Sequence, residues 1–231
     1  MTLNYPRHKQ ILLQILKDIY TEPAVSAYLG FKGGTAAMMF YGLPRHSVDL
    51  DLDLLEQNNA KEVFETINKI TSNYGQIVDS SVQRYNLRNV ISYEKKLQNI
   101  KVEVNLRQFG SRYKTENYLG ISVPVMVKED MFAHKLMAMI ERVGKTSRDI
   151  FDVCYFAEQN WDINRQIVEA RFGGTFKQAL EEAIRILSAM NNRHILDGLG
   201  ELLNDSQKDS ARAKLKNNTI FLLQIMRDNI D

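Results

Sequence analysis

The sequence predicts an α/β fold of the α+β kind, in which a mixed sheet is followed by an all-helical region. In the first part of the chain, apolar residues alternate with polar ones at strand spacing, most clearly from Val48 to Leu54. Upstream, a Gly33-Gly34 pair separates a short apolar segment from a helical one. After Val127 apolar residues recur at helical spacing and strand signals become rare. We therefore expect a sheet-containing core over residues 1–127 and a helical region over residues 128–231.

The elements expected in the core follow from the change between helical and strand periods. In chain order we expect a helix, a strand, a helix, a strand, a helix and four strand-like segments, at 10–19, 28–31, 35–41, 48–54, 60–70, 77–84, 89–93, 100–107 and 119–127. Two helices should follow at 128–143 and 147–158. The remaining helices should break near Gly173-Gly174, Asn191-Asn192 and Asn204-Asp205.

Composition is that of an ordinary globular protein, with 44% hydrophobic and 25% charged residues among 231. The net charge of +2 leaves nucleic-acid binding open, because a basic face can arise from local clustering. Cys154 is the single cysteine, so no disulfide forms within the chain. The first residues lack a signal pattern, and no apolar run approaches the roughly 20 residues that span a bilayer. We expect a cytoplasmic protein without a membrane anchor.

An acidic strand is the clearest candidate for chemistry. Asp49, Asp51 and Asp53 share one face of the strand, at a spacing of about 6.6 Å along the chain. A cation among them would relieve their repulsion, and Mg²⁺ uses few carboxylates when substrate phosphates supply its other oxygen ligands. Side chains two residues apart can also reach paired metal ions roughly 3.5 to 4 Å apart. The alternative is a solvated charged face without a ligand.

Two further segments could complete such a site. Residues 100–107 alternate cleanly and place Glu103 on a polar face, where it would supply a third carboxylate if this strand lies beside the first. The Gly33-Gly34-Thr35 turn could bring backbone N–H groups and the hydroxyl of Thr35 to a triphosphate. The alternatives are an ordinary polar face and a plain tight turn in which Thr35 is a helix N-cap.

The first helix of the C-terminal region carries a lysine in an unusual place. Lys135 lies on the flank of the apolar face rather than opposite it, where it could reach a phosphate. Alternatively, its stem only covers apolar surface while the ammonium reaches water. Further on, Arg148 and Asp152 are four residues apart and could form a surface ion pair.

Several motifs together resemble the AbiEii/AbiGii abortive-infection toxin family, within the DNA polymerase beta-like nucleotidyltransferase superfamily. The resemblance spans roughly residues 31–156 and rests on Phe31-Lys32-Gly33-Gly34-Thr35-Ala36, Arg45-His46-Ser47-Val48-Asp49-Leu50-Asp51-Leu52, Lys101-Val102-Glu103-Val104, Glu129, Lys135 and Arg148-Asp149-Ile150-Phe151-Asp152. It implies a polymerase beta-like core whose helical region completes the active site and binds the acceptor or an antitoxin.

The resemblance also implies a toxin of a type IV toxin–antitoxin pair, active in phage defence, that transfers a nucleoside monophosphate from an NTP to an acceptor such as tRNA. Mg²⁺, or Mn²⁺ in its place, would be the cofactor. Matching this chain to the family's motifs implies that the metal is bound by Asp49, Asp51 and Glu103. It implies that the nucleotide is bound by Gly33, Gly34, Thr35, Lys135 and Arg148. Asp152 would take the catalytic role of the acidic residue in the last motif. The alternative is a non-catalytic nucleotide-binding or regulatory module that retains the fold.

Overall fold

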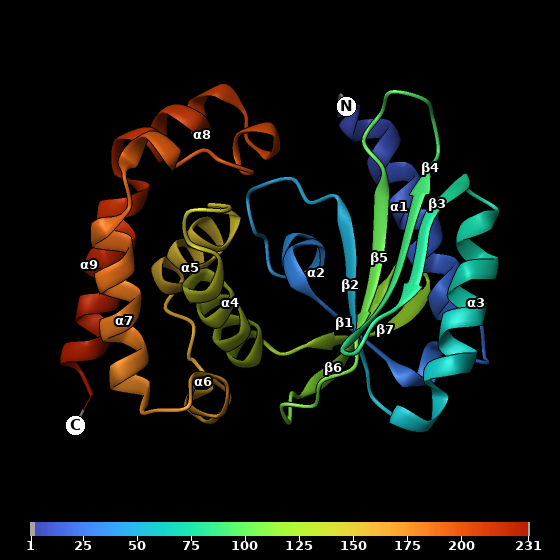
Figure 1. Cartoon of the computed structure of the whole chain (residues 1–231), viewed down its shortest axis with the longest axis horizontal. Helices are drawn as coiled ribbons and strands as arrows, with labels where there is room; N and C mark the ends of the chain where they lie inside the picture. Colours follow the sequence, from blue (N-terminus) through green and yellow to red (C-terminus); the bar gives the residue numbers. More distant parts are fainter. Residues whose placement is uncertain (1–2, 231) are drawn as a thin grey trace. The chain divides into compact units, whose positions relative to one another are not determined.

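The computed structural model describes residues 3–230 and divides into two compact units. The first unit comprises Met1–Gln108 and Arg112–Met126, and the second comprises Phe109–Ser111 and Val127–Asp231. Figure 1 traces both units along the chain, from blue at the N-terminus to red at the C-terminus. Within residues 3–230, no helix is long and apolar enough to cross a membrane.

The first unit is built on a seven-stranded mixed sheet in the order β3-β4-β5-β2-β1-β7-β6. The pairs β2/β5 and β1/β7 are parallel, and the other neighbours are antiparallel. The strands are β1 (Leu29–Lys32), β2 (Asp49–Leu54), β3 (Gln76–Val82), β4 (Asn86–Ser92), β5 (Ile100–Asn105), β6 (Tyr113–Tyr118) and β7 (Ile121–Met126). A mixed sheet followed by helices is the predicted fold class, which is thereby confirmed.

Three helices flank this sheet, namely α1 (Tyr5–Thr21), α2 (Gly33–Phe40) and α3 (Ala60–Ser72). In Figure 1, α1 and α3 cover one face of the sheet and α2 lies on the other. Along β2 the leucines are buried and Asp49 and Asp51 are partly exposed. Because successive side chains of a strand point to opposite faces, the leucines of β2 pack on the face covered by α1 and α3. The aspartates lie on the face that carries α2.

One strand was missed by the sequence reasoning, which expected a single apolar segment at 119–127. That segment is β7 only, and Leu119 and Gly120 form the turn of a hairpin in which both residues have positive φ. Its partner β6 contains mostly polar residues and is an edge strand with little burial on either face. An edge strand of this kind carries no alternation for a periodicity argument to detect.

The second unit is helical, and its helix ends follow the predicted breaks. Its helices are α4 (Lys128–Arg142), α5 (Arg148–Glu158), α6 (Arg165–Phe172), α7 (Phe176–Ala189), α8 (Asp205–Ser210) and α9 (Lys216–Asp228), with a π-helical segment Ala211–Leu215 before α9. Gly173 ends α6 in the left-handed conformation, and Thr175 caps α7 in a capping box with Gln178. Asn204 caps α8 in the same way.

Gly30 provides the first test of this fold. A Cβ at Gly30 of β1 would collide with the ring of Tyr113. Tyr113 belongs to β6, and its ring reaches Gly30 over β7, the strand between them. Gly30→Ala is therefore expected to lower the free energy of unfolding by about 1–3 kcal/mol, the usual cost of overpacking. Urea denaturation measures the effect, with Gly200→Ala as the control because its added Cβ would lie 3.6 Å from its nearest neighbour. Wild-type stability for Gly30→Ala would mean that Tyr113 does not pack as described.

Candidate active site

The acidic face is assembled where β2 and β5 run side by side. Their parallel register places Asp49 opposite Lys101, and Asp51 opposite Glu103. Directly opposed residues on neighbouring strands share a face and approach closely. The sequence interpretation required this strand to lie beside the aspartates if Glu103 was to join them, and the register meets that condition. Asp49, Asp51, Glu103 and Lys101 thus lie on the same side of two adjacent strands.

Lys101 offsets part of the charge of these carboxylates, and the sequence reasoning gave it no role. Its Nζ lies 3.0 Å from Glu103 Oε2 and 3.9 Å from Asp49 Oδ2. Burial alone would lower the pKa of Lys101, but the charges of Asp51, Asp49 and Glu103 outweigh burial and raise it. The ammonium group therefore carries its charge at neutral pH. In the structure the Lys101 ammonium therefore lies among the carboxylates to which the sequence analysis assigned a metal.

The start of α2 faces the same carboxylates. Gly33 has φ +79°, and a Cβ there would collide with the carboxylate of Asp51. The helix begins at Gly33, two residues before the predicted start, and its N-cap Lys32 contributes no side-chain hydrogen bond. Thr35 is accordingly inside the first turn, so the alternative that made it the N-cap is wrong. The glycine allows backbone and carboxylate to approach, and a helix N-terminus favours an anion.

Thr35 is fully buried and its hydroxyl is engaged within the protein. The hydroxyl donates to the carbonyl of Asp49 at 2.5 Å and lies 2.9 Å from the Oγ of Ser47. Since a hydroxyl has one hydrogen, Ser47 must donate in the second contact. Thr35 therefore fixes the backbone at Asp49, while its predicted contact with a triphosphate stays a prediction.

Arg45 is a second residue near the glycines to which the sequence reasoning gave no role. It is only 5% exposed, and its Nη1 donates to the carbonyl of His46 at 2.8 Å. A Cβ at Gly34 would lie 2.6 Å from Arg45 Nη2 and 3.0 Å from Ser47 Oγ. A buried guanidinium thus adjoins the first turn of α2, where it adds positive charge to the helix N-terminus.

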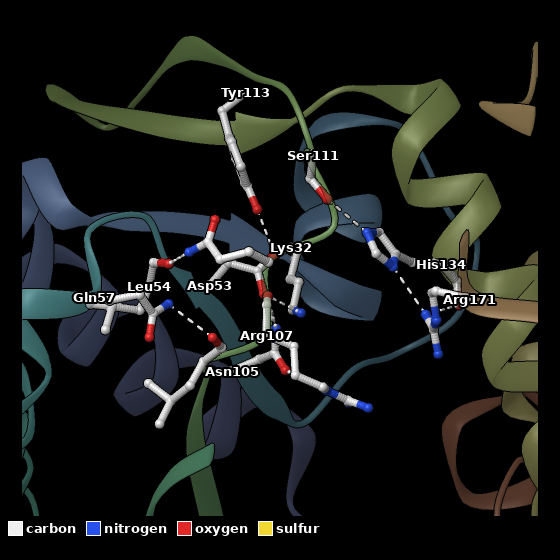
Figure 2. Close-up of polar contacts among 12 residues, drawn as sticks. Lys32, Asp53, Leu54, Gln57, Asn105, Arg107, Ser111, Tyr113, His134 and Arg171 are labelled. Atoms are coloured by element: carbon white, nitrogen blue, oxygen red, sulfur yellow. Dashed lines mark hydrogen bonds and ion pairs between the residues drawn. The ribbon is translucent and has the colours of Figure 1, made fainter. Parts of the chain in front are cut away.

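Asp53 has a different environment from the other two aspartates, although it lies on the same strand face. Its Oδ1 accepts from Lys32 Nζ at 2.5 Å and from Asn105 Nδ2 at 2.7 Å, and its Oδ2 accepts from the hydroxyl of Tyr113 at 2.5 Å. Figure 2 shows these side chains converging on the one carboxylate. Asp53 is 7% exposed, so it is a buried, paired and hydrogen-bonded charge that ties β1, β5 and β6 to β2.

In the second unit, Lys135 forms ion pairs with two buried carboxylates. Its Nζ lies 3.0 Å from Asp149 Oδ1 and 2.7 Å from Asp152 Oδ2, and the side chain is 13% exposed. Arg142 Nη2 lies 2.9 Å from the other oxygen of Asp149. The lysine does not merely cover apolar surface, because it joins α4 to α5 through both aspartates. The phosphate-binding roles of Lys135 and Arg148, and the catalytic role of Asp152, stay predictions.

A serine and a histidine also meet in the second unit, as Figure 2 shows. Arg171 Nη1 lies 2.9 Å from His134 Nδ1, and Ser111 Oγ lies 2.7 Å from His134 Nε2. Arginine only donates, so Nδ1 must accept and the ring proton must be on Nε2. His134 then donates to Ser111 and cannot take its proton. Nor is Cys154 reactive, since burial raises the pKa of its thiol to about 11.

The carboxylates of the first unit fit a hard cation by chemistry, although they do not form a closed protein cage. Among residues 3–230 no group of three or more His, Cys, Asp or Glu side chains is arranged to hold a metal ion. Mg²⁺, however, commonly uses one or two carboxylates together with substrate phosphates. Asp49 and Asp51 provide that number, and Glu103 adjoins Asp51.

A mixed sheet with an Asp-x-Asp strand beside a glycine-rich helix start defines a protein of the nucleotidyltransferase class. Two crystal structures from Helicobacter pylori share the fold. JHP933 is 19% identical with a TM-score of 0.65, covering 98% of this chain and 94% of its own. A candidate nucleotidyltransferase is 17% identical with a TM-score of 0.65, covering 99% and 96%. Among curated proteins, none matches the sequence.

The family follows from the sequence match. The chain belongs to the nucleotidyl transferase AbiEii toxin family of type IV toxin–antitoxin systems, whose model matches residues 14–221. This confirms the resemblance deduced from the motifs. Membership makes the chain a transferase by family and implies a cognate antitoxin as partner.

Lys101 yields a prediction about cation binding. Lys101→Met removes the ammonium group from beside Glu103 and Asp49, so the carboxylates repel one another until a cation joins them. Without Mg²⁺ the variant should unfold at a Tm about 2 to 4 °C below wild type, which corresponds to roughly 1 kcal/mol. Mg²⁺ should then raise its Tm more than that of wild type, because ligands stabilise the state that binds them.

Lys61→Met is the control for this measurement, since Lys61 is exposed and lies away from the carboxylates on α3. Differential scanning calorimetry with and without Mg²⁺ measures all three proteins. An equal response of wild type and Lys101→Met to Mg²⁺ would contradict the role given to Lys101.

Lys135 yields a second prediction. Lys135→Ala should lower the free energy of unfolding by about 3 kcal/mol, because it leaves two buried carboxylates without this cation. If the lysine also contacts substrate phosphate, NTP binding should weaken by about 1.5 to 3 kcal/mol. Titration calorimetry well below the Tm separates the two effects, with exposed Lys177→Ala as the control. Unchanged NTP affinity would reject the phosphate role and leave only the ion pairs.

Proposed function

We propose that this protein transfers a nucleoside monophosphate from an NTP to an RNA acceptor, such as the 3′ end of tRNA, in a reaction that depends on Mg²⁺. The observation that carries the proposal is the β2/β5 register. It places Glu103 directly beside Asp51, which is two residues along β2 from Asp49. The family match supports nucleotidyl transfer as the reaction type. As a type IV toxin the protein would act in the cytoplasm in defence against phage, restrained by its antitoxin.

The residues of the first unit would divide the work of this reaction. Asp49, Asp51 and Glu103 would hold Mg²⁺, which neutralises phosphate charge and polarises the acceptor hydroxyl when bound. The N–H groups of Gly33 and Gly34, at the start of α2, would receive the triphosphate. Arg45, beside Gly34, would add positive charge there.

In the transfer itself, the acceptor hydroxyl oxygen forms a bond to the α-phosphorus and the bond from that phosphorus to the β-phosphate oxygen breaks. Pyrophosphate and the hydroxyl proton leave. Protein groups need only position the two substrates and offset their charge, which is how phosphoryl-transfer enzymes gain most of their rate. The alternative function, a non-catalytic nucleotide-binding module, would bind NTP without forming a product.

Substitution of the three aspartates tests the proposal. Asp49→Asn and Asp51→Asn should each abolish Mg²⁺-dependent transfer, and the double variant should be little worse than either, because groups that act as a unit are not additive. Each labelled NTP is incubated with total bacterial RNA, and the labelled product is resolved on a gel. Expression of Asp49→Asn should likewise not arrest bacterial growth where wild type does.

Asp53→Asn is the matched control, because it changes the same residue type on the same strand face. It should keep most transfer activity below its Tm, although it loses stability as the ion pair with Lys32 is lost. Folded Asp49→Asn and Asp51→Asn proteins with near-normal transfer would refute the mechanism. NTP binding without any labelled product from wild type would favour the non-catalytic alternative.

A further inference from the structure

Three of the four exposed large hydrophobic side chains described in the first unit lie on its edge strand β3 and the turn that follows, and the fourth is Leu119. Among residues 3–230, the large hydrophobic side chains that remain exposed include Val78 and Val82 of β3 and Tyr85 of the β3–β4 turn, at 48%, 64% and 45%. The turn is tight, since Gln83 N donates to the carbonyl of Asn86 at 2.8 Å. Tyr85 is thus at the tip of a hairpin, where its ring remains accessible to a ligand.

Two guanidinium groups accompany the ring of Tyr85. The Cζ of Arg84 lies 5.0 Å from the ring centroid and that of Arg107 lies 5.7 Å from it. Both arginines are exposed. Such an arrangement of an aromatic ring with arginines is the one that single-stranded nucleic acid uses, because bases stack on the ring and phosphates pair with guanidinium.

The same turn is held rigidly against the end of β5. Leu106 N donates to the carbonyl of Tyr85 at 2.8 Å. Arg107 Nε donates to Asn105 Oδ1 at 3.1 Å, and Asn105 in turn donates to Asp53. Figure 2 shows Arg107 and Asn105 next to Asp53. The position of Arg107 is thus fixed relative to the strand that carries Asp49 and Asp51.

Arg88 lies between this turn and the carboxylates. On β4 it is directly opposite Glu103 of β5 and so faces the same side of the sheet. Its side chain is 42% exposed, and its Nε lies 3.0 Å from Asp79 Oδ2 without the alignment of a hydrogen bond. A phosphate could therefore compete for this guanidinium. Arg107 follows Glu103 by four residues, at most about 13 Å along the chain.

We propose that Arg84, Tyr85, Arg88 and Arg107 form a strip that binds single-stranded RNA and leads its reacting end toward Asp49, Asp51 and Glu103. This inference rests on the proposed function and adds to it the surface of this chain that binds the RNA acceptor. A base of the strand stacks on Tyr85 in place of one of the two guanidinium groups that lie over the ring, and Arg84 and Arg107 then pair with neighbouring phosphates. Arg88 holds the phosphate nearest Glu103. The strip selects unpaired strands, because a duplex hides the base faces that Tyr85 needs.

The test measures RNA binding by the full chain without NTP or Mg²⁺, so that it does not depend on transfer. The probe is a short fluorescein-labelled single-stranded RNA of mixed sequence, followed by fluorescence anisotropy. Tyr85→Ala should weaken binding on the order of tenfold, the usual effect of losing one stacked base, while Tyr85→Phe should bind like wild type. Arg107→Ala and Arg88→Ala should each make the slope of log K against log salt concentration about 0.7 less steep, as expected for one lost phosphate contact.

Lys61→Ala is the charge-matched control, since Lys61 is an exposed cation of the first unit that lies on α3 and outside the strip. It should leave affinity unchanged, and circular dichroism checks that every variant is folded. Wild-type affinity in Tyr85→Ala and Arg107→Ala would overturn the proposal and leave the exposed β3 edge to a protein partner. Equal losses in Tyr85→Phe and Tyr85→Ala would also overturn it, because stacking would not be the cause.

The outcome for the strip is separable from that for the proposed function. If RNA binding falls as expected but wild type labels no RNA, the strip stands and nucleotidyl transfer to RNA fails. If wild type labels RNA while the strip variants bind as tightly as wild type, transfer stands and the strip fails.

Discussion

The parallel pairing of β2 with β5 is the constraint on which the first unit depends. It places Asp51 beside Glu103, two anions whose repulsion must be offset before the sheet can form. The offset comes from the same strand pair, because Lys101 stands beside Glu103 and within 3.9 Å of Asp49. Lys101 thus offsets part of the repulsion on this acidic surface from within the protein. The lysine that offsets this repulsion is also the group that the proposed Mg²⁺ would displace or share.

Asp51 and Asp53 show how neighbours decide the role of chemically identical residues. Both lie on one face of β2, and their sequence context is nearly the same. Asp53 meets Lys32, Asn105 and Tyr113, which supply one positive charge and three hydrogen bonds. Asp51 instead meets a glycine without a side chain and a second carboxylate, and it shares the charge of Lys101 with Asp49 and Glu103. One environment satisfies the anion and stabilises the sheet, whereas the other leaves negative charge available to a ligand.

Periodicity predicted the parts of the site that depend on one strand at a time. The alternation in residues 48–54 and 100–107 fixed which side chains share a face, and Gly33 and Gly34 marked the helix start within two residues. Strand neighbours 50 residues apart leave no such periodic signal, so the roles of Lys101 and Arg45 were missed. The polar edge strand β6 was missed too, and with it the partner of Asp53 in Tyr113. Tertiary pairing, rather than local propensity, decided these features.

The small net charge of the chain conceals a separation of charge within the first unit. Carboxylates occupy the beginning of β2 and the middle of β5, whereas Arg84 and Arg107 lie by the turn at the far end of β5. An RNA strand is repelled by bare carboxylates, so its approach to them needs compensating cations close by. Arg88, opposite Glu103, supplies one at the boundary between the two regions. In the proposed reaction these arginines would therefore hold the polyanion next to an acidic centre whose charge Mg²⁺ would offset.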